Sequence, residues 1–314
     1  MLARPDRRTF LAAAASLSLA ATGRAFAADD APPAAPLRPV QFGVSTYSFW
    51  QFRAEPAPIE DCIDRAARMG FDGVEILQVQ MGDDQSNARL QRLKRQAHAH
   101  GLALMGFSTH QGFVNPDKAV RDDNIAKTLN SIDTAYRLGI PTMRINTGRW
   151  GTSKNFDDLM ANKGIEPNLP GHTDEEGFGW VIASIERLLP RAEECGVVLG
   201  LENHWGLGRT AAGVMRIVEA INSPWLQVTL DTGNFLDDSP AQMEKLAPAC
   251  CLVQAKTYDG GGKWYSLDID YKAVAAMLRR YRYEGWVSLE FEGKADPDEA
   301  VPASLARLEE AFST

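Results

Sequence analysis

Short apolar runs alternate with longer amphipathic stretches along most of the chain. Each run is continuous rather than alternating with polar residues, as expected for a strand of a parallel sheet that is buried on both faces. Eight such strands are predicted, at residues 41–46, 73–77, 102–108, 142–146, 197–202, 226–231, 251–256 and 286–290.

Helical periodicity fills the intervals between these strands. The predicted helices lie at about residues 59–69, 87–100, 122–138, 179–195, 211–221, 240–246, 270–281 and 297–312. Gly70, Gly101, Gly139 and Gly196 each follow a helical run, where a left-handed cap is favoured. Eight strand-helix units predict an α/β fold, a single-domain (β/α)₈ barrel that spans residues 40–314.

Polar and aromatic side chains gather where the apolar strands end. In a (β/α)₈ barrel these ends meet at one mouth, which carries the active site. The connection 147–178 is the longest and lacks clear periodicity, so we expect a lid over the mouth. The candidate residues at strand ends are Tyr47, Trp50, Glu75, His110, Arg144, Trp150, Glu202, His204, Trp205, Asp231, Asn234, Gln254, Lys256 and Glu290.

Three carboxylates carry the clearest chemical signal. Glu202, Asp231 and Glu290 end the fifth, sixth and eighth strands, so they should converge at the mouth. Crowded carboxylates raise one another's pKa unless a cation neutralises them, and a divalent metal is the simplest such cation. The alternative is that the three are independent, solvated or salt-bridged residues.

The N-terminus has the pattern of a targeting signal. Arg7 and Arg8 precede a short apolar stretch, and Ala25-Phe26-Ala27 forms a small-x-small cleavage site. The apolar run 10–22 is too short to span a bilayer. We therefore expect a twin-arginine signal peptide at 1–27, a Pro/Ala-rich linker at 28–39, export by the twin-arginine machinery to the periplasm or the medium, and no stable membrane insertion after processing.

The net charge of the mature chain limits the classes of partner that it can bind. Removing residues 1–27, with four Arg and one Asp, changes the formal charge from −8 to −11, which disfavours nucleic acid and anionic membranes as partners.

The cysteines are Cys62, Cys195, Cys250 and Cys251, without metal-binding spacing. Export permits a disulfide, but their places in helices and before a strand favour free, mostly buried thiols.

Four segments resemble a known family. GFDGVEI (70–76), LENHWG (201–206), DTGNF (231–235) and GWVSLEFEG (285–293) are similar to xylose-isomerase-like TIM barrels, the sugar phosphate isomerases/epimerases of the AP endonuclease family 2 superfamily, relatives of tagatose 3-epimerase and inosose dehydratase. The resemblance covers essentially all of residues 40–314. Many of these barrels dimerise, so it also implies a homodimer as a partner.

The resemblance implies a metal held by Glu202, Asp231, a ligand on the seventh strand that is usually His, and Glu290. Here Gln254 stands where many relatives have that histidine. A Gln carbonyl makes the donor set all-oxygen, which favours Mn²⁺ or Mg²⁺ over Zn²⁺.

The resemblance also implies catalytic roles. Such a metal polarises a carbonyl and stabilises the enediolate formed when a neighbouring C–H loses its proton. In the epimerase relatives the fifth- and eighth-strand glutamates are both ligands and bases, which assigns these roles to Glu202 and Glu290. His204 resembles the family's substrate-contacting histidine.

Other candidates have two interpretations each. Lys256 either stabilises an oxyanion or pairs with a carboxylate, and His110 is either a proton relay or structural. Glu75 either orients Lys256 or His110 or acts on substrate. Trp50, Trp150 and Trp205, with Tyr47, Arg144 and Asn234, are predicted to bind substrate, and the tryptophans have core or lid packing as their alternative.

The predicted function is a metal-dependent isomerase or epimerase of an unphosphorylated sugar or keto-sugar. A lyase or hydratase acting on 3-keto glycosides or inososes is the alternative reaction. A non-catalytic sugar-binding protein is the alternative of another class, with Gln254 marking a degenerate site. The endonuclease IV branch is disfavoured, because it needs a histidine-rich zinc site and a basic surface, whereas this chain has five histidines and an acidic balance.

Overall fold

The computed structural model describes residues 39–53 and 55–313. The predicted signal peptide (1–27) lies outside the described residues, as does the predicted linker up to residue 38. Among the described helices, none has the length and apolar character needed to cross a membrane. The four cysteines are free.

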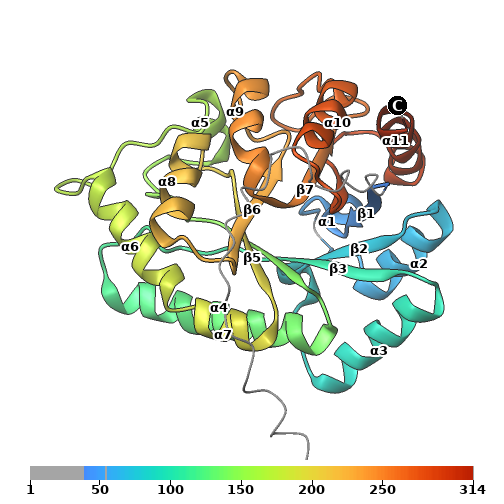
Figure 1. Cartoon of the computed structure of the whole chain (residues 1–314), viewed down its shortest axis with the longest axis horizontal. Helices are drawn as coiled ribbons and strands as arrows, with labels where there is room; N and C mark the ends of the chain where they lie inside the picture. Colours follow the sequence, from blue (N-terminus) through green and yellow to red (C-terminus); the bar gives the residue numbers. More distant parts are fainter. Residues whose placement is uncertain (1–38, 54, 314) are drawn as a thin grey trace, which may run out of the picture. The chain divides into compact units, whose positions relative to one another are not determined.

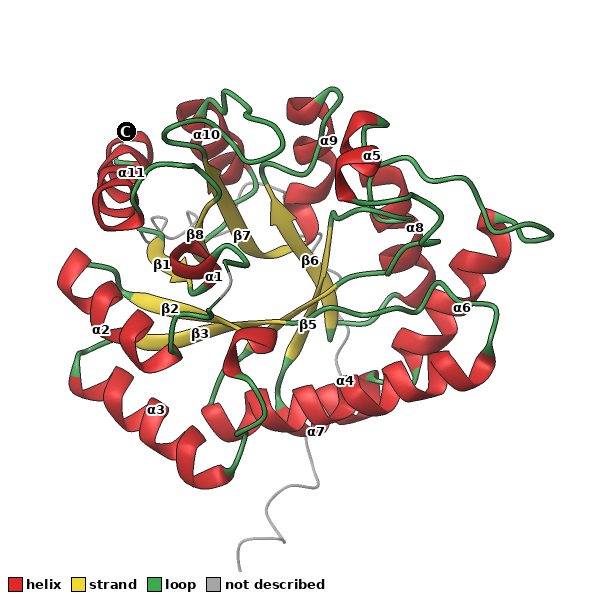
Figure 2. Cartoon of the chain, turned by 180° about the vertical axis from the view of Figure 1, so that it is seen from behind, coloured by secondary structure: helices red, strands yellow, loops and turns green. Residues whose placement is uncertain are grey.

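Eight parallel strands close into a barrel, with each strand beside the next in the chain and the last beside the first (Figures 1 and 2). The predicted (β/α)₈ barrel is therefore confirmed, and each predicted strand end is within one residue of the observed one. The strands are β1 (Gln41–Ser45), β2 (Gly73–Leu77), β3 (Ala103–Ser108), β4 (Thr142–Ile145), β5 (Val198–Glu202), β6 (Leu226–Asp231), β7 (Cys250–Thr257) and β8 (Trp286–Phe291).

Helices surround the barrel (Figure 2). They are α1 (Tyr47–Trp50), α2 (Ile59–Met69), α3 (Asn87–Ala99), α4 (Lys118–Leu138), α5 (Phe156–Ala161), α6 (Asp174–Glu186), α7 (Leu189–Cys195), α8 (Ala211–Ile221), α9 (Ser239–Leu246), α10 (Tyr271–Arg280) and α11 (Pro297–Phe312), with 3₁₀ turns η1 (Gln78–Met81) and η2 (Ala247–Ala249). Gly70, Gly139 and Gly196 adopt the predicted left-handed caps.

The prediction of one helix at 179–195 was wrong. The segment forms two helices, α6 and α7, because Pro190 lacks an N–H and its ring would clash with the carbonyl of Glu186 in a continuous helix. Helix α6 also begins earlier than predicted, at Asp174, where Thr173 and Glu176 form a reciprocal capping box. The predicted irregular connection 147–178 therefore contains α5 and the start of α6.

Side-chain alternation in the strands separates the apolar core from the mouth of the barrel. In β8, Val287, Leu289 and Phe291 belong to the apolar core, while Ser288 and Glu290 alternate with them. Successive side chains of a strand point to opposite faces, so the second set faces the barrel interior. The same alternation in the neighbouring strands brings their last polar residues together inside the mouth.

The loops after β4 and β5 touch at two glycines. Gly206 has φ of 94°, and a Cβ added there would overlap the carbonyl oxygen of Gly148.

We expect Gly206→Ala to destabilise the fold by roughly 2 kcal/mol or more, through backbone strain and overpacking together. Gly179→Ala is the matched control, because that position in α6 has open space around it and a helical alanine gains about 1 kcal/mol. Thermal unfolding followed by circular dichroism measures both, and an unchanged midpoint for Gly206→Ala would contradict this account.

Candidate functional site

A cavity of about 360 Å³ opens at the C-terminal ends of the barrel strands. Each strand from β1 to β8 except β6 contributes a lining residue, and the loop after β6 contributes Asn234. The lining residues are Ser45, Tyr47, Phe52, Leu77, Ser108, His110, Arg144, Phe156, Glu202, His204, Trp205, Asn234, Gln254, Lys256, Lys263, Trp264, Tyr265, Glu290 and Glu292.

Glu202 is held by a buried ion pair. Its Oε2 atom lies 3.0 Å from Nη1 of Arg144, and its Oε1 atom accepts a hydrogen bond of 3.2 Å from Asn234. Burial raises the pKa of Glu202 to about 7, although the Arg144 charge opposes the rise. The carboxyl group is therefore suited to both accepting and releasing a proton near neutral pH.

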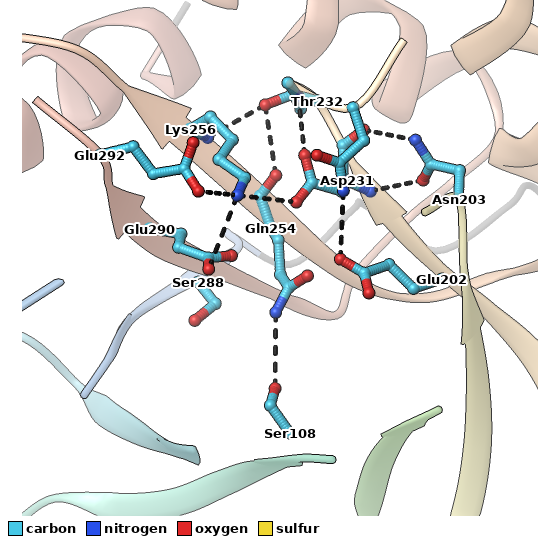
Figure 3. Close-up of polar contacts among 12 residues, drawn as sticks. Ser108, Glu202, Asn203, Asp231, Thr232, Gln254, Lys256, Ser288, Glu290 and Glu292 are labelled. Carbon is cyan, nitrogen blue, oxygen red and sulfur yellow. Dashed lines mark hydrogen bonds and ion pairs between the residues drawn. The ribbon is translucent and has the colours of Figure 1, made fainter. Parts of the chain in front are cut away.

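Lys256 lies among three carboxylates, those of Glu292, Asp231 and Glu290 (Figure 3). Its Nζ atom is 2.6 Å from Glu292 Oε1, 3.5 Å from Asp231 Oδ2 and 3.6 Å from Glu290 Oε1. Burial alone would lower the pKa of Lys256, but the three carboxylates outweigh burial and raise it well above its ordinary value. The Lys256 side chain therefore stays positively charged at neutral pH.

Glu75 lies beneath the cavity and orients Gln254. Its Oε1 atom accepts hydrogen bonds from Gln254 Nε2, at 2.7 Å, and from Ser108 Oγ, and its Oε2 atom accepts one of 2.5 Å from Ser288. Because the amide nitrogen of Gln254 is bound to Glu75, the amide oxygen is left without a hydrogen-bond partner. Glu75 hydrogen bonds to neither Lys256 nor His110 and does not line the cavity. Burial raises its pKa.

Two histidines form one wall beside Arg144. The Nε2 atom of His110 lies 3.2 Å from Nη2 of Arg144, and the rings of His110 and His204 are 6.3 Å apart. Desolvation in this wall, and then the Arg144 charge, lowers the pKa of His110 to about 3 and that of His204 well below its ordinary value. Both rings are therefore neutral at neutral pH.

Aromatic rings form the outer wall of the cavity. Trp205 lies beside Tyr265, and Phe156 of α5 packs on Trp264 with ring centroids 4.4 Å apart. Phe156 comes from the connection predicted as a lid. Four lining residues were not predicted from the sequence: Phe52, Phe156, Tyr265 and Glu292. Of these only Glu292 carried a signal, because it has the same strand parity as Glu290.

Besides Glu75, two predicted substrate-binding residues do not line this cavity. Trp50 donates a hydrogen bond of 2.7 Å to the carbonyl oxygen of Arg53 and packs against Phe52. Trp150 donates one of 3.1 Å to Asp174, packs against Trp180, and lines a separate cavity of about 350 Å³. Packing is therefore their role in this structure. Tyr47, Arg144, Trp205 and Asn234 line the cavity at the barrel mouth as expected.

A family model described as xylose isomerase-like TIM barrel matches residues 63–311. The chain belongs to this family. The family resemblance stated from the four sequence segments is confirmed at this level.

Solved structures share the barrel of this xylose isomerase-like chain. The 3-keto-D-glucoside 4-epimerase YcjR from E. coli is 18% identical with a TM-score of 0.67, and the match covers 86% of this chain and 99% of that one. The D-psicose 3-epimerase from Clostridium cellulolyticum H10 is 19% identical, with a TM-score of 0.68 and 87% and 99% coverage. An L-ribulose 3-epimerase is 17% identical, with a TM-score of 0.70 and 87% and 95% coverage. A comparison with curated proteins found no match.

Three buried oxygens of the site have no hydrogen-bond partner: Asp231 Oδ2, Gln254 Oε1 and Glu290 Oε2. Buried oxygens without a partner are costly, so a bound cation would account for them. Among the described residues, no three His, Cys, Asp or Glu side chains are already spaced to hold a metal. With Glu202, however, the three oxygens form an all-oxygen set whose chemistry fits Mg²⁺ or Mn²⁺.

The Arg144–Glu202 pair gives a stability prediction. Both side chains are at most 4% exposed, so removing the arginine leaves a buried charge without its partner. We expect Arg144→Met to destabilise the protein by roughly 3–5 kcal/mol, and less when Glu202→Gln is added. Lys272→Met, which breaks an exposed ion pair with Glu310, should cost about 0–1 kcal/mol. Urea unfolding measures all three, and equal costs for the buried and exposed pairs would contradict the assignment.

Proposed function

We propose that this protein is an isomerase or epimerase of a sugar or keto-sugar that moves a proton at a carbon next to a carbonyl. The observation that carries the proposal is the pair of carboxylates, Glu202 from β5 and Glu290 from β8, that face one cavity at the barrel mouth. Epimerisation needs a proton acceptor on one face of the carbon and a proton donor on the other.

The two carboxylates supply these roles. One removes the proton from carbon, and the other returns a proton to the opposite face, so atoms and charge balance over the cycle. The raised pKa of Glu202 favours this exchange, because a carboxyl with a pKa of about 7 is present in both forms near neutral pH. One oxygen of Glu290, Oε2, has no hydrogen-bond partner, so the protein alone does not fully satisfy this carboxylate.

Positive charge in the cavity stabilises the negative charge that develops on the substrate oxygen. Lys256 and Arg144 both line the cavity and are both buried, so their charges act in a poorly screened environment. A divalent cation, Mn²⁺ or Mg²⁺, held by Glu202, Asp231, Gln254 and Glu290, would polarise the carbonyl when bound.

The cavity walls fit a sugar. Aromatic faces suit the apolar faces of sugar rings, and Trp205, Trp264 and Tyr265 provide them. His110, His204 and Asn234 offer neutral polar groups for hydroxyls. The similar solved structures are enzymes of keto-sugars and keto-glycosides, which supports this substrate class. The Arg7-Arg8 pattern supports an exported enzyme, and therefore an unphosphorylated sugar.

Proton NMR in D₂O tests the reaction with free ketoses and 3-keto glycosides. We expect deuterium to replace the proton at the carbon next to the carbonyl. In Glu290→Gln the rate should fall at least about 100-fold, because the base is lost, while thermal unfolding stays near that of the wild type. Glu310→Gln on the surface of α11 is the control and should exchange normally. Full exchange in Glu290→Gln would refute its role, and no exchange with any substrate would refute the proposed reaction.

The proposed ligand role of Gln254 has its own test. Gln254→Ala removes an oxygen donor from the site, so its affinity for Mn²⁺ in calorimetric titration should fall tenfold or more. Gln91→Ala, at an exposed position of α3, should bind Mn²⁺ like the wild type. Unchanged affinity and stoichiometry in Gln254→Ala would show that Gln254 is not a ligand.

A further inference from the structure

Lys256 contacts two side chains that are candidate metal ligands. Its ammonium lies 3.5 Å from Asp231 Oδ2, one of the three buried oxygens without a hydrogen-bond partner, and 3.6 Å from Glu290 Oε1. A cation bound to Asp231 and Glu290 would meet a positive charge at these distances. The ammonium and a metal are therefore alternative partners for the same carboxylates.

Glu292 holds the ammonium more closely than either ligand does. The distance from Glu292 Oε1 to Lys256 Nζ is 2.6 Å, the length of a direct charge-assisted hydrogen bond. Glu292 follows the end of β8 and is not among the proposed metal ligands. It can therefore keep the ammonium while Asp231 and Glu290 bind a metal.

The stem of Lys256 is fixed, so only its head has freedom to move. A Cβ at Gly233 would lie 2.5 Å from Lys256 Cγ, which shows how closely the turn after β6 packs on the stem. The hydroxyl of Tyr271 donates a hydrogen bond of 2.5 Å to the Lys256 carbonyl oxygen, and the Tyr47 ring lies 5.9 Å from Nζ. Small rotations about the terminal bonds are enough to shift the ammonium between carboxylates 2.6–3.6 Å away.

We propose that Lys256 is a built-in competitor of the metal and that Glu292 is the positioning residue that draws its ammonium away from the metal ligands. Without a metal, Lys256 neutralises Asp231 and Glu290; with a metal, it pairs with Glu292 alone. The proposal rests on the proposed function, in which this site holds a divalent cation. It predicts that metal affinity depends on two residues that do not bind the metal.

Calorimetric titration of Mn²⁺ into the full chain and its variants tests this inference. Lys256→Met removes the competitor and should bind Mn²⁺ at least tenfold more tightly than the wild type. Glu292→Gln leaves the ammonium on Asp231 and Glu290, so it should bind at least tenfold more weakly. In the double variant the effect of Glu292→Gln should shrink to less than threefold, because no ammonium remains to be positioned.

Controls separate this effect from general changes in charge and folding. Lys272→Met and Glu310→Gln break an exposed ion pair and should leave affinity within twofold of the wild type. Lys256→Gln, a polar replacement, should show the same gain as Lys256→Met and replaces it if the methionine variant does not fold by circular dichroism.

Three results would overturn the inference: unchanged or weaker Mn²⁺ binding after Lys256 is replaced, an equal effect of Glu292→Gln with and without Lys256, or no Mn²⁺ binding by any of the proteins. Deuterium exchange on sugars is measured separately and decides the proposed reaction. Exchange together with any of these results would retain the reaction and reject the competition. Tighter Mn²⁺ binding by Lys256→Met without deuterium exchange on any substrate would retain the competition and reject the reaction.

Discussion

The site depends on the balance of buried charge at the mouth of the barrel. Five carboxylates lie within or directly beneath one cavity, and two basic side chains, Arg144 and Lys256, lie among them. Burial raises the pKa of Glu75, Glu202 and Asp231, and any buried carboxylate needs a partner or a proton to be stable there. The carboxylates are Glu75, Glu202, Asp231, Glu290 and Glu292.

Each carboxylate meets this requirement with different partners, and these partners indicate its role in the site. Glu75 accepts three hydrogen bonds and orients Gln254. Glu202 instead pairs with the Arg144 guanidinium and accepts a hydrogen bond from the Asn234 amide. Asp231 and Glu290 share one ammonium with Glu292 and each keep an oxygen without a hydrogen-bond partner. The incompletely satisfied oxygens are thus the ones that a bound cation would complete.

The sequence predicted most of the fold because buried parallel strands are continuous apolar runs and a barrel places their ends together. The sequence therefore also predicted that residues such as Glu202 and Lys256 would lie at the same mouth of the barrel. It failed where local pattern does not determine tertiary position. Helical periodicity continues across Pro190, and Trp150 sits in a loop whose path depends on contacts made far away in the sequence. The bond between Glu75 and Gln254 joins residues 179 apart in the chain, so no spacing rule reveals it.

We propose that the oxygens of Asp231, Gln254 and Glu290, together with Glu202, hold a divalent cation, and that the Lys256 ammonium moves onto Glu292 when the cation binds. Anomalous diffraction at the manganese edge, from crystals of the full chain grown with Mn²⁺, tests it most directly. We expect one anomalous peak bound by these four side chains, with the Lys256 ammonium on Glu292 alone. A peak elsewhere, or no peak with the ammonium still against Asp231 and Glu290, would contradict it.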